Sequence, residues 1–595
     1  MPLLFLFPVL LGSQQVDRPQ SVQYTISLAH PEQHLFHITM FIPDVHGSVT
    51  LQMPAWNALY QIRDFSAHVR DIQFGNSMHP QQAAKVDKQT WRVQGDGMVV
   101  VWYVTYWDEP GPFATQLNAD HAFINPAMIL MNIPERRGQP VSLELDGVPE
   151  GWRPTSAIKW GAGSTNNRFP IWSAQHFTYD EMVDAPIEVS NFKEFSIPGL
   201  PVDIRAVVHG DAWSQKKIES DLSRICNYEL KLMDGAPFEH YLFILHIGKG
   251  AGGGGMEHTN STAIGIPSDA DLSGVAAHEF FHLWNVKRIR PATLEPVDYT
   301  KEQYTRALWF AEGVTSTYGA YTLVRSGIWN KDRFYEDLGE QISELESRPA
   351  NRWQSAEQSS LDAWLEKYSL YNGPEDSVSY YTKGQVLGDL LDILIRDRTN
   401  NEKSLDDVLR GLNTDFAKAG KTYRDSLDIR LEAEKVAGGS FEEFFRDYVA
   451  AAGPLPYQRI LGLAGLELRT VEHKKAVLGF SAQRDPAGTV TAREVDDGSR
   501  AAEAGLRSGD VIVNWNGGDV PRSLGRWVRE RQPGETVKVR IRREEKEQTL
   551  KFNLGEEQEV LYQVAEDSRA GEKARHIRDG FLHGVTQTVH FPDGR

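Results

Sequence analysis

The chain has 595 residues, of which 41% are hydrophobic and 24% are charged, and its formal net charge is −18. This length exceeds what one hydrophobic core supports, so we expect three or four soluble globular domains. The acidic balance argues against a general affinity for nucleic acid or for anionic membranes.

The chain begins with an apolar run, Leu3–Leu11, followed by the small residues Gly12 and Ser13. This order is typical of a secretory signal peptide, which we place at residues 1–20. No Lys or Arg precedes the run, which leaves a buried N-terminal strand as the alternative. No later segment has the roughly 20 consecutive apolar residues that span a bilayer. We therefore expect a periplasmic or secreted protein without a membrane span.

Residues 21–190 contain short runs rich in β-branched and aromatic residues, among them SVQYTISL and GMVVVWYVTYW. Pro, Gly and Asp separate these runs, as in a domain built from short strands joined by turns. The pattern predicts an all-β N-terminal domain of the sandwich type.

Residues 191–460 change to a mainly helical pattern. One predicted helix is SGVAAHEFFHLWNVKRI, for which Asp269, Asp271 or Ser273 would be the cap. Another is TKEQYTRALWFAEGVTSTYGAYTLV, which opens with Thr300 and Gln303 at capping-box spacing. Residues 461–555 return to a β-rich pattern, and residues 556–595 contain a charged amphipathic stretch and a polar tail. The whole pattern predicts a multidomain α+β protein.

The sequence His278-Glu279-Phe280-Phe281-His282 is an HExxH pattern. Residues four apart share one face of a helix, so both imidazoles can reach one ion, and Glu279 can take a proton from a water on that ion. The only cysteine, Cys226, excludes a cysteine-rich zinc site and an intrachain disulfide. A metal here would therefore need histidine and carboxylate ligands.

A catalytic zinc ion typically has three protein ligands and one open position. Glu312, in LWFAEGVTSTYG, lies on a separate predicted helix and follows the apolar residues Leu308, Trp309 and Phe310. A buried carboxylate is costly without a positive partner, and a metal ion would compensate it. Glu312 is therefore the expected third ligand, with a solvated helix acid as the alternative interpretation.

With these helices in view, the sequence resembles the glycyl aminopeptidase family of zinc peptidases. This family carries a C-terminal PDZ domain and belongs to the thermolysin-like group with Glu as third zinc ligand. HEFFHLWNVKRIRP and LWFAEGVTSTYG resemble its metal-binding helices, and TYDEMVDAPIEV resembles its lead-in to the catalytic domain. QMPAWNALYQIRDF is similar to a further segment, although Ala58-Leu59 replace the usual Pro-Gly. The resemblance implies that residues 191–460 form a thermolysin-like catalytic domain.

The resemblance also implies two substrate-handling sites. GGGGMEH at residues 252–258 is similar to a segment in which a Glu holds the free amino terminus of the substrate, which points to Glu257. The glycines, Gly254 and Gly255 among them, would let the substrate approach the backbone closely. The preceding segment HYLFILHIG is expected to be the edge strand against which a peptide pairs. An exposed acid on a flexible glycine loop is the alternative.

Tyr381, in Tyr380-Tyr381-Thr382-Lys383-Gly384, corresponds to the Tyr of the Tyr-x-Lys-Gly motif of the same relatives. By this resemblance its hydroxyl stabilises the oxyanion of the tetrahedral intermediate, a reasonable role for a phenol donor aimed at developing negative charge. An aromatic packing pair at the start of a helix is the alternative.

Near the C-terminus, Leu478-Gly479-Phe480 precedes SRAAEAGLRSGDVIVNWNG. This order resembles a PDZ domain, here at residues 461–555, which captures a peptide terminus by adding a strand to a sheet edge. A structural PDZ domain with a blocked groove is the alternative.

Together these observations predict a zinc metallopeptidase with one Zn²⁺ per chain, bound by His278, His282 and Glu312. Glu279 would be the general base and Tyr381 the oxyanion donor. The expected partners are peptides with a free N-terminus and a C-terminal peptide at the PDZ domain, and not nucleic acid. A preference for N-terminal Gly or Ala is implied by the resemblance alone. The alternatives are an endopeptidase using the same site, or a chaperone-like peptide-binding protein without catalysis.

Overall fold

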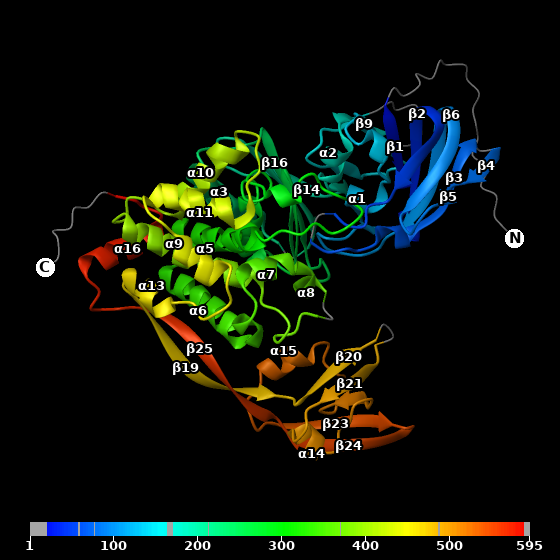
Figure 1. Cartoon of the computed structure of the whole chain (residues 1–595). Coiled ribbons are helices and arrows are strands. Elements are labelled where there is room, and N and C mark those ends of the chain that lie inside the picture. The colour runs from blue at the N-terminus through cyan, green and yellow to red at the C-terminus, as the bar shows by residue number, and fades with distance from the viewer. Residues whose placement is uncertain are drawn as a thin grey trace.

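The computed structural model describes residues 21–57, 60–76, 78–162, 171–211, 213–368, 371–485 and 488–587. The predicted signal peptide and the Ala58-Leu59 pair lie outside these residues. The described chain forms an N-terminal β-rich domain, a helical middle domain and a C-terminal β-rich domain (Figure 1), which confirms the predicted fold class. None of its helices combines the length and the apolar character that crossing a membrane requires.

In the N-terminal domain, two sheets contribute to one core. The larger sheet has the order β11-β12-β9-β1-β2-β6-β3-β4, with β5 paired to β6. Buried and partly exposed residues alternate along β1, because successive side chains of a strand point to opposite faces. The strands are β1 (Val22–Ser27), β2 (Leu35–Gln52), β3 (Val69–Asn76), β4 (His79–Gln82), β5 (Ala84–Lys85), β6 (Thr90–Tyr106), β9 (Val141–Asp146), β11 (Gly161–Ala162) and β12 (Trp172–Phe177).

The smaller sheet, β10-β13-β8-β7, lies between the N-terminal core and the catalytic domain. Ile187 and Val189 pack into the N-terminal core, whereas Phe123 packs with residues of the catalytic sheet. Glu188 is paired with Phe123 across the two strands and shares its face, so it faces the catalytic domain. The elements are β7 (Gln116–Leu117), β8 (Ala122–Ile124), β10 (Arg153–Thr155), β13 (Ile187–Ser190), α1 (Pro126–Ile129) and α2 (Tyr179–Val183).

The middle domain combines a five-stranded sheet, ordered β14-β15-β16-β18-β17, with the helices that form its main core. Its strands are β14 (Lys193–Ser196), β15 (Asp203–Gly210), β16 (His240–Ile247), β17 (Gly254–Glu257) and β18 (Ser261–Ile266). Its helices are α3 (Gln215–Leu232), α4 (Leu272–Phe281), α5 (Thr315–Arg325), α6 (Lys331–Ser347), α7 (Ala356–Leu361), α8 (Ala363–Lys367), α9 (Tyr380–Arg398), α10 (Leu405–Leu412), α11 (Asp425–Ala437), α12 (Glu442–Phe444) and α13 (Tyr457–Leu463).

Two sequence predictions for this domain are wrong. The segment HYLFILHIG is β16, a central strand between β15 and β18, and the edge strand is β17. A continuous apolar run is typical of a strand covered on both faces, which an edge strand is not. Thr300 and Gln303 do not open a helix. The Gln303 side chain instead accepts the backbone N–H of Asp298 and so holds a loop.

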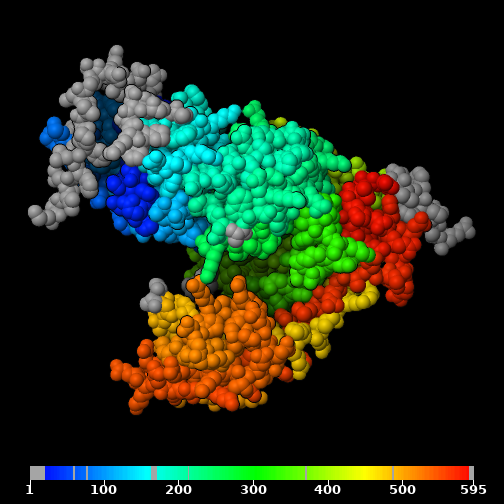
Figure 2. Space-filling view, turned by 180° about the vertical axis from the view of Figure 1, so that it is seen from behind, coloured from blue at the N-terminus to red at the C-terminus, as the bar shows by residue number. Residues whose placement is uncertain are grey.

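The C-terminal domain is a five-stranded sheet with its own core, joined to the rest of the molecule by a two-stranded ribbon. The ribbon strands are β19 (Leu466–Val477) and β25 (Gly555–Glu566), and β25 packs on α6. After β25, α16 (Glu572–His583) contributes Ile577 and Phe581 to the core of the middle domain. Figure 2 shows the five-stranded body set below the rest of the molecule. Its elements are β20 (Phe480–Arg484), β21 (Val490–Val495), β22 (Val511–Trp515), β23 (Thr536–Arg543), β24 (Lys546–Asn553), α14 (Arg500–Glu503) and α15 (Leu524–Arg529).

Candidate metal centre

The two histidines of the HExxH pattern lie at the C-terminal end of α4 and bring their ring nitrogens together. His278 is in the last turn and His282 is the first residue after the helix, and their Nε2 atoms are 2.9 Å apart. His282 Nδ1 is 2.7 Å from the Asn285 carbonyl oxygen, which can only accept a hydrogen bond. The proton therefore sits on Nδ1, and the Nε2 lone pair of His282 faces the centre.

The tautomer of His278 follows from its hydrogen bond in the same way. The Ser316 hydroxyl donates to the Glu312 carbonyl oxygen at 3.1 Å, so its oxygen is the acceptor for His278 Nδ1 at 3.3 Å. As neutral imidazoles, both histidines thus present the lone pair of Nε2 to the same point, and this is the form that binds a metal ion.

Glu312 completes the donor set from a π-helical turn, Trp309–Val314, that leads into α5. Its Oε2 lies 3.4 Å from His278 Nε2 and 3.3 Å from His282 Nε2, and the residue is 3% exposed. Its Oε1 accepts a hydrogen bond of 3.0 Å from the hydroxyl of Tyr60, a residue of the N-terminal domain. A π-helical turn interrupts the regular helix register and is frequent at functional sites.

The pKa shifts of Glu312, His282 and His278 are those expected of a site that binds a cation. Burial alone would raise the pKa of Glu312, but the two imidazoles outweigh it and hold that pKa well below its usual range. Burial would lower the pKa of His282, yet Glu312 raises it to about 10, so a metal ion that binds here displaces a proton from this imidazole. Burial and the neighbouring His282 lower the pKa of His278. The carboxylate is therefore ionised, buried and dependent on a cation.

Glu279 lies beside this donor set and is itself buried, at 6% exposed. A Cβ on Gly255 would lie 2.5 Å from the Glu279 carboxyl carbon, so only glycine in β17 admits this side chain. Its Oε2 has no hydrogen-bond partner among the described residues. Burial raises the pKa of Glu279 well above its usual range, opposed by His282, and the charges of Glu257 and Glu312 raise it further. A raised pKa favours proton uptake, as a general base requires.

Tyr381 faces the centre from the first turn of α9, whose N-cap is Ser379. Its ring centroid is 6.0 Å from that of His278, and Lys367 Nζ lies 3.4 Å from its hydroxyl. Burial, followed by the charge of Glu312, raises the pKa of Tyr381 well above its usual range. The phenol therefore keeps its proton and remains a hydrogen-bond donor. The backbone carbonyl oxygen of Trp309 lies against Gly384, at the place where any other residue would have its Cβ atom. Glycine at this position therefore lets α9 approach the π-helical turn closely.

The edge strand β17 brings Glu257 to the same centre. One carboxylate oxygen from each of Glu257 and Glu279 and one nitrogen of His282 lie within 4.8 Å of one another. The predicted pair Gly254 and Gly255 opens this strand, and Gly254 has a positive φ of 95°. The structure thus brings together the three predicted metal ligands, Glu257, Glu279 and Tyr381, with Gly255 against Glu279, whereas Gly254 lies against Phe113.

An ion-pair network from the N-terminal domain holds the strand end that follows Glu257. Asp184 accepts hydrogen bonds from Lys287 at 2.8 Å and from the Thr259 backbone N–H at 2.9 Å, and it lies 3.2 Å from His258 Nδ1. The Lys287 and His258 charges outweigh burial and hold the pKa of Asp184 well below its usual range. Asp184 therefore stays ionised and links β17 to the turn after α4.

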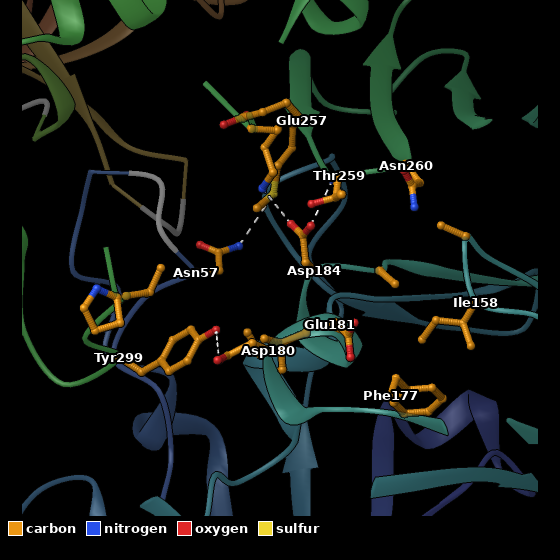
Figure 3. Close-up of a pocket in the computed structure, with 18 of the residues that line it drawn as sticks. Asn57, Ile158, Phe177, Asp180, Glu181, Asp184, Glu257, Thr259, Asn260 and Tyr299 are labelled. Carbon is orange, nitrogen blue, oxygen red and sulfur yellow. Dashed lines mark hydrogen bonds and ion pairs between the residues drawn. The ribbon is translucent and has the colours of Figure 1, made fainter. Parts of the chain in front are cut away.

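A cleft of about 610 Å³ leads away from Glu257 between the N-terminal and catalytic domains. Figure 3 shows Asn57, Asp184 and Thr259 near Glu257 of β17, and the Tyr299 hydroxyl bonded to Asp180. The Tyr299–Asp180 hydrogen bond is 2.9 Å long. Tyr60 also lines this cleft, so the cleft reaches the metal centre on that side.

The sequence interpretation missed four residues that orient the centre: Tyr60, Asp184, Ser316, and Asn285 through its backbone carbonyl. Ser316 is four residues after Glu312 on the same helical face, and this spacing was a usable signal. Tyr60 and Asp184 belong to another domain, and only their place in segments resembling the family connects them with the site.

The fold and the centre together define a metallopeptidase, because a His-His-Glu donor set lies beside a buried carboxylate base in a thermolysin-like arrangement. Models of known families agree. The M61 glycyl aminopeptidase model matches residues 271–387, the M61 peptidase N-terminal domain model matches residues 23–191, and a PDZ domain model matches residues 466–554. The chain thus carries the M61 glycyl aminopeptidase and M61 N-terminal domains, followed by a C-terminal PDZ domain.

Among solved structures, an aminopeptidase N family protein from Idiomarina loihiensis is similar, with a TM-score of 0.77 and 24% identity over 94% of this chain and 100% of that chain. It has the same fold. An M1 zinc metallopeptidase from Deinococcus radiodurans gives a TM-score of 0.45 at 12% identity, over 73% of this chain and 93% of that one. Yeast LTA4 hydrolase in complex with bestatin gives 0.44 at 13% identity, over 75% and 71%. No curated protein matches the chain.

Proposed function

We propose that the protein is a zinc aminopeptidase that removes small residues, Gly or Ala, from the free N-terminus of peptides. The observation that carries this proposal is the position of Glu257, whose carboxylate lies next to Glu279 and the metal-binding face of His282. An acid at this place can pair with the cationic amino group of a substrate whose first peptide bond is at the centre.

One zinc ion per chain would be held by His278, His282 and Glu312. The donor set fits this ion, since two imidazole Nε2 atoms and a buried, ionised carboxylate face one point, as in catalytic zinc sites. When bound, zinc lowers the pKa of water to about 7 and polarises a carbonyl group.

The side chains of this protein then supply the proton transfers. Glu279 accepts a proton from the attacking water and returns it to the leaving amine, for which its buried position and raised pKa are suited. Tyr381 donates a hydrogen bond to the oxyanion. Tyr60 positions Glu312 through its hydroxyl, and Asn285 and Ser316 fix the histidine tautomers.

Glu257 would set the register of cleavage. A free α-amine has a pKa near 8 and is mostly cationic at pH 7, so it pairs with a carboxylate. The His258–Asp184–Lys287 network fixes the strand end that carries Glu257, which keeps the anchor at a constant place relative to Glu279. The family description, glycyl aminopeptidase, supports the preference for a small first residue.

The test compares free and N-acetylated peptides that begin with Gly, Ala or Leu. Wild-type protein should prefer free amines and small first residues. Glu257→Gln should lower kcat/KM for free-amine peptides about 10- to 100-fold, as expected for a charge-assisted hydrogen bond, and leave acetylated peptides almost unchanged. Glu295→Gln, which removes an exposed acid from the same cleft, is the matched control. Equal cleavage of free and acetylated peptides by the wild type would instead indicate an endopeptidase.

For the PDZ domain, we propose that it binds the C-terminal segment of a peptide. β20 is an edge strand of its sheet, so its outer backbone groups are available for strand addition. A groove of about 1120 Å³ runs between β20 and α15 and is lined by Phe480, Ala482, Leu524 and Val528. Calorimetric titration of the full chain with peptides ending in a free or an amidated carboxylate tests this, since only the free form should bind.

A further inference from the structure

A second cluster of metal-binding side chains lies at the junction of the N-terminal and catalytic domains and shares no residue with the centre described above. Glu188 on β13 and His121, immediately before β8, come from the N-terminal domain. His246 on β16 and His209 on β15 come from the catalytic domain. Glu188 is 0% exposed, His121 is 5% exposed and His246 is 6% exposed, so the cluster is buried.

The donor atoms of this cluster converge on the Glu188 carboxylate. His246 Nε2 is 3.0 Å from Oε2, His121 Nδ1 is 3.4 Å from Oε1, and His209 Nδ1 is 3.8 Å from Oε1. Metal–ligand bonds of 2.0–2.2 Å in tetrahedral geometry place neighbouring ligand atoms roughly 3.3–3.5 Å apart. The separations of His246 and His121 from Glu188 lie around this value, and the donor atoms of these three side chains all lie within 4.8 Å of one another. His209 is farther from Glu188, and its ring stacks parallel on that of His121 with 4.1 Å between centroids, so the in-plane lone pairs of these two rings do not converge on one ion.

The tautomer of His121 is fixed by a side chain outside the cluster. The Gln116 amide nitrogen donates to Asp108 Oδ1 at 2.9 Å, so its oxygen faces His121 Nε2 at 3.0 Å. An amide oxygen only accepts, which places the His121 proton on Nε2. In the neutral imidazole the lone pair of Nδ1 then points at the Glu188 carboxylate, so either a second proton on His121 or a metal ion must lie between these two acceptors, which are 3.4 Å apart.

The negative charge of the buried Glu188 carboxylate also favours a bound cation. Within the described chain, the ion pairs of Glu188 are all with histidines, and its Oε1 has no hydrogen-bond donor. A buried carboxylate without a cationic partner is strongly disfavoured. A cavity of about 220 Å³, lined by His121, His209 and His246, adjoins the cluster and offers an entry path.

We propose that His121, Glu188 and His246 bind a second divalent transition-metal ion of the class that imidazole favours, such as Zn²⁺. Because His121 and Glu188 come from the N-terminal domain and His246 comes from the catalytic domain, the ion links the N-terminal domain, which carries Tyr60 and Asp184, to the catalytic sheet. The proposal does not depend on the aminopeptidase function.

The test is the zinc content per chain, measured by mass spectrometry after dialysis against a weak chelator at pH 7. Wild-type protein should hold two ions, Glu188→Gln one, Glu312→Ala one, and the double variant none. His240→Gln is the matched control, because His240 lies on the same strand but bonds the Ala157 carbonyl oxygen outside the cluster. It should keep both ions.

Two results separate this proposal from the proposed catalytic centre. A single wild-type ion that Glu312→Ala loses and Glu188→Gln keeps would overturn the second site. A single ion that Glu188→Gln loses and Glu312→Ala keeps would support the second site and remove Glu312 from the catalytic ligand set.

A calorimetric titration tests the second site even if the Glu188 variant does not fold, because it uses a different variant. Glu312→Ala leaves the second cluster intact, so this protein, stripped of metal, should bind Zn²⁺ with 1:1 stoichiometry. Its melting temperature should also rise with zinc, since a ligand that binds only the folded state stabilises it. Absence of both effects in this folded variant would overturn the proposal.

Discussion

The N-terminal and PDZ domains flank the same catalytic domain but relate to its centre in different ways. In the N-terminal domain, Tyr60 donates a hydrogen bond to Glu312 and Asp184 accepts one from Lys287. The smaller sheet of this domain packs on the catalytic sheet. The PDZ domain has a separate core and is joined by the β19–β25 ribbon. A domain that shares a buried interface with the centre is part of it, whereas a domain attached by a ribbon can act as an independent binding module.

The largest loss of activity is expected from a change inside the catalytic domain, and the effects of changes in the two flanking domains are compared with it. Glu279→Gln keeps the shape of the side chain but cannot accept a proton, so kcat should fall roughly 10³-fold while the metal content stays at the wild-type level. Steady-state kinetics with metal analysis on the same sample check this. A kcat near that of the wild type would exclude Glu279 as the base.

Tyr381→Phe should lower kcat about 10²-fold, because one oxyanion donor is lost while the ring packing on Tyr380 is kept. Separate kcat and KM values for one short peptide decide the role. A change confined to KM would make Tyr381 a binding residue.

Tyr60→Phe tests the contribution of the N-terminal domain. Loss of the hydrogen bond to Glu312 should weaken metal affinity or kcat roughly 10-fold, the usual scale for groups that orient a metal ligand. Zinc affinity from competition with a chelator gives the readout. Tyr299→Phe is the control, since its hydroxyl bonds Asp180 and does not touch the centre, and it should stay within about 2-fold. Equal effects of both variants would indicate general destabilisation of the interface.

The smallest effect is expected from removing the PDZ body. Val477 and Gly555 are partners at the end of the ribbon, so residues 478–554 can be replaced by an Asn-Gly hairpin turn that leaves α16 in place. Cleavage of short peptides should change less than about 2-fold, and that of long peptides with a PDZ ligand at the C-terminus should fall more. Equal losses for both lengths would mean that the domain supports the catalytic fold.

The sequence predicted those parts of the site that local periodicity determines. His278, Glu279 and His282 share one helix, and Tyr381 starts another, so their spacing alone fixes their relation. The order of the strands is set by long-range pairing, which is why β16 was misplaced at the edge and β17 was not recognised as the edge strand. The π-helical turn under Glu312 arises from tertiary packing that no residue pattern shows.

The contacts between side chains of different segments could not be predicted from the sequence for the same reason. Tyr60 meets Glu312 across 252 positions of the chain, and His121 meets Glu188 across 67. Single tyrosines and histidines carry no local signal for such contacts, because burial and partner are decided by how the domains pack. The second cluster therefore became visible only in the structure.

The central claim is that Glu312 and the two HExxH histidines hold the ion on which hydrolysis depends. The most direct test is to measure bound zinc and peptide turnover on one preparation each of wild-type and Glu312→Ala protein. The variant should hold one ion fewer than the wild type and should lose turnover with it, because two imidazoles alone leave the ion under-coordinated. A variant with the wild-type number of ions and wild-type turnover would contradict the account.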